Sequence, residues 1–352
     1  MDRILVINPG STSTKVAVFE DEKKLCGENI EHTVEDLGDL AILEQGPMRK
    51  TAVLDFLNRQ GISLDSLSAV VGRGGVLPPV KSGAYLVDEN LIDALKHKST
   101  PHASNLGGII AAEIAGQAGV NAYIYDSIAV DEMDEMAHLS GTPLVRRTSH
   151  FHALNSRAMA IEYAKSQGKN YKDLNLIVAH MGGGISTSAH CKGNIIDMTA
   201  DDEGTFSPTR AGRVHTRILV DLCFSGTYAR KEMQTLLRGK GGLFAYLGTA
   251  DAREVEKRIA EGDEYAEMVY RGMAYQIGKD IGSLATVLKG EVDAIILTGG
   301  VAYSKMLTGW VKEQVSFLAP VVVLPGEHEM EALSQGVIRV LRGEETAQTF
   351  TD

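Results

Sequence analysis

The chain has 352 residues, of which 44% are hydrophobic and 23% charged, and its formal net charge at pH 7 is −11. These values are ordinary for a globular protein of about two domains, and the acidic balance argues against binding to nucleic acid or to an anionic membrane. No apolar run approaches the ~18 residues that span a bilayer. The composition therefore predicts a soluble two-domain protein.

The cysteines and the N-terminus indicate a compartment. Cys26, Cys191 and Cys223 are widely spaced and form no CxxC pair, which is typical of a reducing environment. The apolar run at residues 4–7 is too short for the core of a signal peptide and is typical of a buried first strand. We therefore expect a cytoplasmic protein.

Hydrophobic periodicity and turn residues predict strands and helices that alternate along the chain. In the first half we expect strands at 3–8, 15–21 and 24–33, a helix at 48–60, a strand at 67–72, helices at 88–98 and 105–119, and a strand at 122–125. In the second half we expect a helix at 151–167, strands at 174–179, 185–190 and 194–197, several helices across 217–290, a strand at 292–298, a helix at 304–317, a strand at 321–324 and a helix at 329–342. This order predicts a layered α/β protein with a meander at the start of each half.

Residues 5–14 and 177–186 form an internal repeat. Each copy is an apolar strand, a polar residue, a turn that contains glycine, and Ser or Thr residues that enter a second strand. A spacing near half the chain predicts two lobes of the same topology, although any two hairpins with glycine turns share these features. Backbone N–H groups of such turns can converge on phosphate oxygens, while no GxxxxGK[ST] or helix-opening GxGxxG is present.

Nine segments in chain order resemble motifs of the acetate and butyrate kinase family, within the wider group of actin-like, Hsp70-like and sugar-kinase-like ATPases. They are residues 7–15, 71–75, 101–106, 125–127, 146–152, 180–184, 207–212, 297–302 and 327–329. Pro9, the turn at residues 182–184 and the stretch PGEHEMEALSQG are more similar to the butyrate branch of this family than to the acetate branch.

The resemblance implies an α/β protein of two lobes with a duplicated ribonuclease H-like (actin-like ATPase) fold and an active site in the interlobe cleft. The expected N-terminal lobe spans residues 1–148, with the C-terminal helix 331–352 packing back on it, and residues 149–330 form a nucleotide-binding lobe. The implied reaction is reversible transfer of phosphate from ATP to butyrate or a branched short-chain fatty acid, giving acyl phosphate and ADP, with Mg²⁺. We expect a homo-oligomer built on dimers that binds neither nucleic acid nor membrane.

The resemblance also assigns residues to roles. Catalytic roles fall to Arg73, His152, Arg210 and Asp126. Nucleotide contacts fall to Asn8, Gly10, Ser11, Thr12, His180, Gly182, Gly183, Gly184, Gly299 and Gly300. Arg73, Gly75 and His102 would bind the acid, and Asp126 and Glu329 would hold Mg²⁺, which prefers one or two carboxylates plus substrate oxygens. Guanidinium forks suit the planar oxygens of carboxylate and phosphate groups.

Several alternatives stay open at this point. His150 competes with His152 for the transferred phosphoryl group, and Glu327 is the local alternative to Glu329. Small residues at 74 and 75, beside Arg73, are expected to leave room for an acyl chain longer than acetate. The competing functions are an acetate or propionate kinase of the same family, a non-metabolic actin-fold ATPase, and a sugar kinase.

Overall fold

The computed structural model describes residues 1–38, 40–97 and 101–351, so Lys98, the last residue of one predicted helix, lies outside the described residues. The chain forms two compact units. Unit 1 comprises Met1–Asp131 and His328–Asp352, and unit 2 comprises Glu132–Glu327. In the described residues no helix is both long and apolar enough to cross a membrane.

Unit 1 is built on one mixed sheet. Within the described residues its strand order is β3-β2-β1-β4-β6-β5. The strands are β1 (Arg3–Pro9), β2 (Ser13–Glu20), β3 (Lys23–Glu31), β4 (Ala69–Arg73), β5 (Ala84–Leu86) and β6 (Asn121–Tyr125). β1 pairs antiparallel with β2 and parallel with β4, so both of its edges are hydrogen-bonded. This central position explains why its apolar run is continuous, since both faces of the strand are buried.

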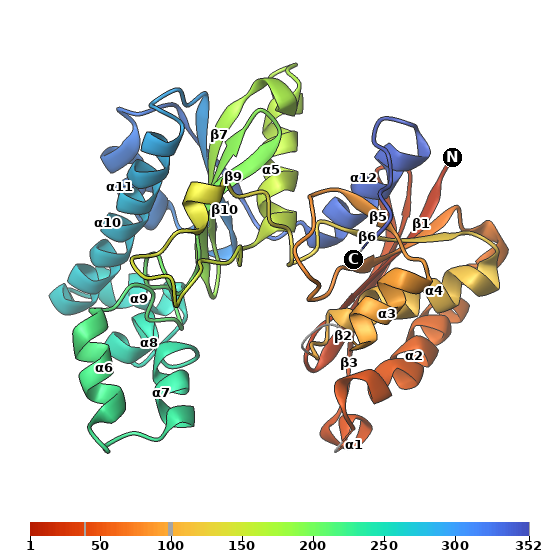
Figure 1. The fold of residues 1–352 in the computed structure, drawn as a ribbon, viewed down its shortest axis with the longest axis horizontal. Coiled ribbons are helices and arrows are strands. Elements are labelled where there is room, and N and C mark those ends of the chain that lie inside the picture. Colours follow the sequence, from red (N-terminus) through yellow and green to blue (C-terminus); the bar gives the residue numbers. More distant parts are fainter. Residues whose placement is uncertain (39, 98–100, 352) are drawn as a thin grey trace. The chain divides into compact units, whose positions relative to one another are not determined.

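Helices cover the sheet of unit 1 on both faces (Figure 1). They are α1 (Val34–Leu37), α2 (Gly46–Arg59), α3 (Glu89–His97), α4 (Asn105–Ala118) and α12 (Glu329–Leu341). Leu5 and Ile7 of β1 share a core with the apolar residues of α2 and α4. The C-terminal helix α12 packs on β1, β4 and β6.

A close crossing of α4 and β4 fixes the end of β4. A Cβ atom built on Gly72 would overlap the backbone of Gly107, and one built on Gly107 would overlap the backbone of Arg73. Helix and strand therefore meet backbone to backbone, which only glycine permits at these two positions. The crossing holds Arg73, the last residue of β4, in a defined place.

Unit 2 repeats this plan. In the part of the chain that is described, its strand order is β11-β10-β7-β8-β9, with β7 (Asn175–Met181), β8 (Ile185–Cys191), β9 (Asn194–Thr199), β10 (Ala294–Gly299) and β11 (Val321–Pro325). The helices are α5 (Ala153–Ser166), α6 (Thr216–Phe224), α7 (Arg230–Leu237), α8 (Gly242–Leu247), α9 (Ala252–Ala260), α10 (Glu264–Val287) and α11 (Lys305–Val315). Leu176 and Val178 pack with α5, whereas Ile177 and Ala179 pack with α10 and α11, as the alternation of a strand requires.

The duplicated topology predicted from the sequence is confirmed. β7 pairs antiparallel with β8 and parallel with β10, as β1 does with β2 and β4. The pairing of the second and third strands shifts register at Val18/Phe19 in unit 1 and at Ala189/His190 in unit 2. The overlay of 5–14 on 177–186 slips by one residue after the turn, because the turn in unit 2 is one residue shorter.

The observed unit boundaries differ from the predicted ones. The chain changes unit at Asp131/Glu132 and at Glu327/His328, whereas the sequence placed the changes at 148/149 and 330/331. The segment after Asp131 belongs to unit 2 because it is tied to β9: Asp134 N donates to Ile196 O at 2.9 Å, and the Glu132 carboxylate accepts from Ile195 N at 3.1 Å. The short edge strand β5 was not predicted.

One buried histidine gives a test of this core. His190 is fully buried on β8, where its ring bonds the Tyr171 hydroxyl at 2.7 Å and the Ser188 hydroxyl at 2.9 Å. Burial, with the charge of Arg157, lowers the pKa of His190 to about 3. The folded state therefore keeps the ring neutral while the unfolded chain takes up a proton below its ordinary pKa.

We expect the free energy of unfolding to fall as the pH drops below about 6.5 towards 3, by up to ~1.4 kcal/mol per pH unit from this group. His190→Gln should flatten this dependence between pH 6.5 and 5, measured by urea unfolding followed by circular dichroism. His97→Gln, at an exposed position, is the control and should keep the wild-type slope. An unchanged slope in His190→Gln would contradict the assignment.

Candidate active site

The turn after β1 is the first candidate phosphate site. Gly10, Ser11 and Thr12 are exposed between β1 and β2, and Gly10 N donates to Ser13 O at 2.8 Å. Thr14, which follows, is fully buried. The turn is thus an exposed loop on a buried base, a shape suited to presenting backbone N–H groups to an anion.

Three predicted residues of unit 1 meet at one carboxylate. Arg73 Nη1 donates to Glu329 Oε1 at 2.7 Å, and Asn8 Nδ2 donates to Glu329 Oε2 at 2.8 Å. The side chains of Arg73 and Glu329 are only 11% and 27% exposed. Burial raises the pKa of Glu329, but the Arg73 charge and the hydrogen bond from Asn8 outweigh burial, so its pKa is lowered. Glu329 is therefore a stable carboxylate at neutral pH.

Asp126 holds a strained turn at the end of β6. Its φ is 40°, a left-handed conformation that costs a non-glycine residue about 1 kcal/mol or more. Its backbone N–H donates to Gly83 O at 3.1 Å, and its carboxylate accepts from Gly83 N at 2.7 Å. The side chain is buried.

The two predicted metal ligands, Asp126 and Glu329, are both carboxylates, the ligand type that Mg²⁺ prefers. No group of three or more His, Cys, Asp or Glu side chains arranged for a metal ion occurs among the described residues. Mg²⁺ usually takes only one or two protein carboxylates and completes its shell with water and phosphate oxygens. Glu329 already accepts two hydrogen bonds, and a carboxylate offers about four acceptor positions, so Glu329 retains capacity for the ion.

Gly75 follows Arg73 by two residues, and His102 precedes α4. A Cβ atom on Gly75 would overlap the side chain of Asn105, and one on Gly74 would lie 2.7 Å from Cβ of Ser127. The space expected for a longer acyl chain at these Cβ positions is filled by protein, so the two glycines allow close packing there. His102 is exposed before α4, with Nδ1 2.7 Å from the Ser104 hydroxyl.

Unit 2 carries the second candidate phosphate turn, Gly182 to Gly184. Gly182 N donates to Gly184 O at 2.9 Å, and the Gly183 carbonyl accepts from the hydroxyls of Ser207 at 2.6 Å and Thr209 at 3.2 Å. These contacts fix the turn on the segment that carries Arg210.

Two predicted histidines are stacked beside this turn. The rings of His152 and His180 lie 4.0 Å apart with an interplanar angle of 10°. His152 Nδ1 is 2.8 Å from the Ser186 hydroxyl, and His180 Nδ1 is 3.0 Å from Asn155 Nδ2. His150 is exposed, whereas His152 contacts His180 and Ser186 on the two strands that flank the turn, and these contacts favour His152.

Arg210 also belongs to this group. It pairs with the buried carboxylate of Asp201, and its guanidinium lies where a Cβ on Gly184 would point. Burial and the nearby Arg238 lower the pKa of Arg210 to about 10, so it stays charged at neutral pH. Arg210 and Arg238 line a cavity of about 580 Å³ in unit 2.

Gly299 is the last residue of β10 and Gly300 follows it. Gly299 has φ of 89°, and a Cβ there would overlap the backbone of Met181, so the end of β10 lies directly against the end of β7. Gly300 lines a second cavity of about 490 Å³, together with Arg253 and Tyr303. Its size suits an aromatic base and a sugar.

Asn155, Arg49 and the role of Arg147 were not predicted from the sequence. Asn155 Nδ2 links His180 to the Thr298 hydroxyl at 3.2 Å. It lies three residues after His152, one helical turn along α5, which was a usable signal. Arg49 lies beneath the turn after β1, and its spacing carried no signal.

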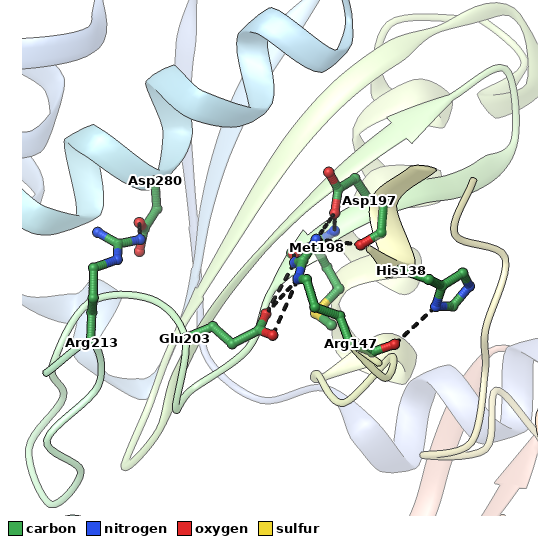
Figure 2. Close-up of polar contacts among 8 residues, drawn as sticks. His138, Arg147, Asp197, Met198, Glu203, Arg213 and Asp280 are labelled. Atoms are coloured by element: carbon green, nitrogen blue, oxygen red, sulfur yellow. Dashed lines mark hydrogen bonds and ion pairs between the residues drawn. The ribbon is translucent and has the colours of Figure 1, made fainter. Parts of the chain in front are cut away.

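Arg147 anchors the first segment of unit 2 (Figure 2). Its guanidinium donates to the Glu203 carboxylate at 3.0 Å, to Asp197 at 3.3 Å, and to the carbonyls of Ala137 and Met198, both at 2.6 Å. Burial lowers the pKa of Arg147, but Glu203 and Asp197 outweigh burial and raise it. Its neighbour Arg146 makes an exposed pair with Glu135 at 3.2 Å.

The two units thus share one ribonuclease H-like plan, and each carries a glycine turn with an arginine near it. Residues 124–319 match the acetokinase family. The chain is 49% identical to butyrate kinase 2 of Clostridium acetobutylicum, over 99% of both chains. The chain belongs to the acetokinase family.

Solved structures agree on the fold. The acetate kinase of Porphyromonas gingivalis matches with a TM-score of 0.82 and 21% identity, over 96% of this chain and 99% of that one. A propionate kinase from Francisella tularensis matches with a TM-score of 0.75 and 19% identity, over 96% and 99%. The predicted α/β, ribonuclease H-like fold is confirmed.

The neighbouring arginines 146 and 147 form a matched pair of substitutions. Arg147→Met should lower the free energy of unfolding by about 2–3 kcal/mol, because it removes the charged donor that these partly buried carboxylates and carbonyls share. Arg146→Met should change it by less than about 0.5 kcal/mol, because exposed ion pairs contribute little. Urea unfolding would measure both values. An effect of Arg147→Met as small as that of Arg146→Met would show that the contacts of Arg147 in Figure 2 add no stability.

Proposed function

We propose that the chain is a butyrate kinase, which reversibly phosphorylates butyrate or a branched short-chain fatty acid with ATP to give acyl phosphate and ADP. The observation that carries the proposal is the identity of 49% to a butyrate kinase over nearly the whole of both chains. The family match supports a carboxylate as the acceptor. The sparse cysteines favour a cytoplasmic location, and family resemblance favours a homo-oligomer.

The proposed chemistry needs alignment and charge neutralisation more than a base. A carboxylate oxygen of the acid, already ionised at neutral pH, attacks the γ-phosphorus in line, and the bond to the β-phosphate oxygen breaks as ADP leaves with the electron pair. Arg73 is assigned to the acid, because it is charged and only partly exposed at a strand end. Arg210 and His152 are assigned to the oxygens of the transferred group.

The remaining predicted residues are assigned to binding the nucleotide and its Mg²⁺. The turns at Gly10 to Thr12 and Gly182 to Gly184 would bind phosphates through backbone N–H groups. The cavity at Gly300 would take the adenosine. Mg²⁺, when bound by Asp126 and Glu329, would neutralise phosphate charge and align the transferred phosphoryl group. The interlobe cleft expected from the sequence stays a prediction.

A profile across acids tests the activity. Hydroxylamine trapping of acyl phosphate with C2 to C5 acids should peak at butyrate or a branched C4–C5 acid. Acetate should have a kcat/KM lower by at least about tenfold, since each methylene in an apolar pocket contributes ~1–3 kcal/mol. A peak at acetate or propionate would instead identify a kinase for the shorter acid. ATP hydrolysis that does not depend on any acid, or phosphorylation of sugars, would contradict the proposed carboxylate kinase activity.

The Mg²⁺ assignment has its own test. Glu329→Gln should raise the Mg²⁺ concentration for half-maximal activity at least tenfold, because one anionic ligand is lost. Glu327→Gln is the matched control, since Glu327 is the alternative considered for the same role and lies 3.9 Å from His180. If only Glu327→Gln raises the Mg²⁺ concentration for half-maximal activity, Glu327 is the metal ligand and Glu329 is not.

A further inference from the structure

Arg49 is a buried arginine that binds the turn after β1 from below. It lies on α2 with 0% exposure. Its Nη1 donates to Gly10 O and Ser13 O, both at 2.9 Å, and its Nη2 donates to Ser11 O at 3.0 Å. Three carbonyl groups of one exposed turn therefore point at one guanidinium.

No acid balances this charge in the part of the chain that the structure describes. The other acceptors are Gln45 Oε1, at 2.9 Å from Nη2 and 3.3 Å from Nε, and the Thr14 hydroxyl, at 3.1 Å from Nη1. The Thr14 hydroxyl also lies 2.8 Å from His32 Nε2. Burial, and next the Arg49 charge, lower the pKa of His32, so the ring is neutral at neutral pH. A buried charge with only neutral partners is costly, and proteins seldom retain one without a use.

The same contacts orient the N–H groups of the turn. In a trans peptide the C=O and the following N–H point in opposite directions. Because the carbonyls of Gly10 and Ser11 are drawn to Arg49, the N–H groups of Ser11 and Thr12 are turned away from it. Neither N–H group has an acceptor among the described residues, and both residues are exposed.

We propose that Arg49 is a positioning residue for the terminal phosphates of ATP, which holds the turn with its N–H groups outward and supplies an unbalanced positive charge beneath it. The inference rests on the proposed function, since it needs the nucleotide to bind at this turn. Arg49 acts through the turn and does not itself touch the ligand. Two successive outward N–H groups above a buried cation form a strong site for an anion.

Gln45→Glu separates the charge from the hydrogen bonds. Glu has the shape of Gln and keeps both bonds from Arg49, but it neutralises the guanidinium. We expect the Kd of Mg·ATP, measured by calorimetry without acid, to rise at least fivefold, while the Kd of AMP, which lacks the terminal phosphates, changes less than twofold. The melting temperature should change little, because the buried charge gains a partner while the long 3.4 Å bond from Gln45 Nε2 to Leu40 O is lost. Gln60→Glu, at the exposed end of the same helix, is the matched control and should change neither Kd.

The outcomes separate the two proposals. A Kd for Mg·ATP within twofold of wild type in Gln45→Glu, or equal weakening of Mg·ATP and AMP, overturns the role of Arg49. A wild-type protein that binds neither nucleotide overturns the proposed function instead. If Gln45→Glu loses the wild-type circular dichroism spectrum, Arg49→Lys replaces it. That variant keeps the charge but not the fork, so it should weaken Mg·ATP at least fivefold with AMP unchanged, and any other pattern overturns the inference.

Discussion

The central strand of each unit is the constraint on which the candidate site depends. β1 and β7 are hydrogen-bonded along both edges, antiparallel on one side and parallel on the other. A strand held in this way cannot shift along its neighbours without breaking two ladders and moving its buried side chains. The turns that leave β1 and β7, and the ends of β4 and β10 beside them, therefore emerge at fixed positions.

Three arginines have two kinds of surroundings in a chain whose net charge is −11. Arg73 faces Glu329 and Arg210 faces Asp201. Such pairs can open toward a ligand anion, because the anion replaces the carboxylate as partner. Arg49 has only neutral acceptors, so no carboxylate among the described residues neutralises its charge. Arg49 therefore supplies local positive potential in an acidic protein without the displacement of a carboxylate.

The sequence predicted most strands and helices because their periodicity follows from burial. The continuous apolar run of β7 reflects burial on both faces of the strand. The helical period of apolar residues in α10 reflects burial on one face of the helix. Arg49 escaped prediction because an arginine in an amphipathic helix has the pattern of a solvent-facing residue, and its acceptors are backbone carbonyls, which leave no mark in a sequence. The boundary after Asp131 failed for a similar reason, since it depends on single hydrogen bonds to β9.

The glycines at 74 and 75 show a related limit. Their small size was expected to leave room for an acyl chain, but the sequence could not show what fills the neighbouring space. Asn105 and Ser127 fill it. A glycine in a sequence therefore indicates that another group packs closely against the backbone there, and only the structure identifies that group.

The register shift shared by the two sheets bears on the history of the chain. It falls at Val18/Phe19 and at Ala189/His190, at equivalent places in the pairing of the second and third strands. An extra residue in a ladder is a specific irregularity that families tend to retain. Its presence in both copies is most simply explained by inheritance from a single ancestral unit that already carried it. The difference in turn length would then have arisen after the gene was doubled, as the two copies took on separate tasks.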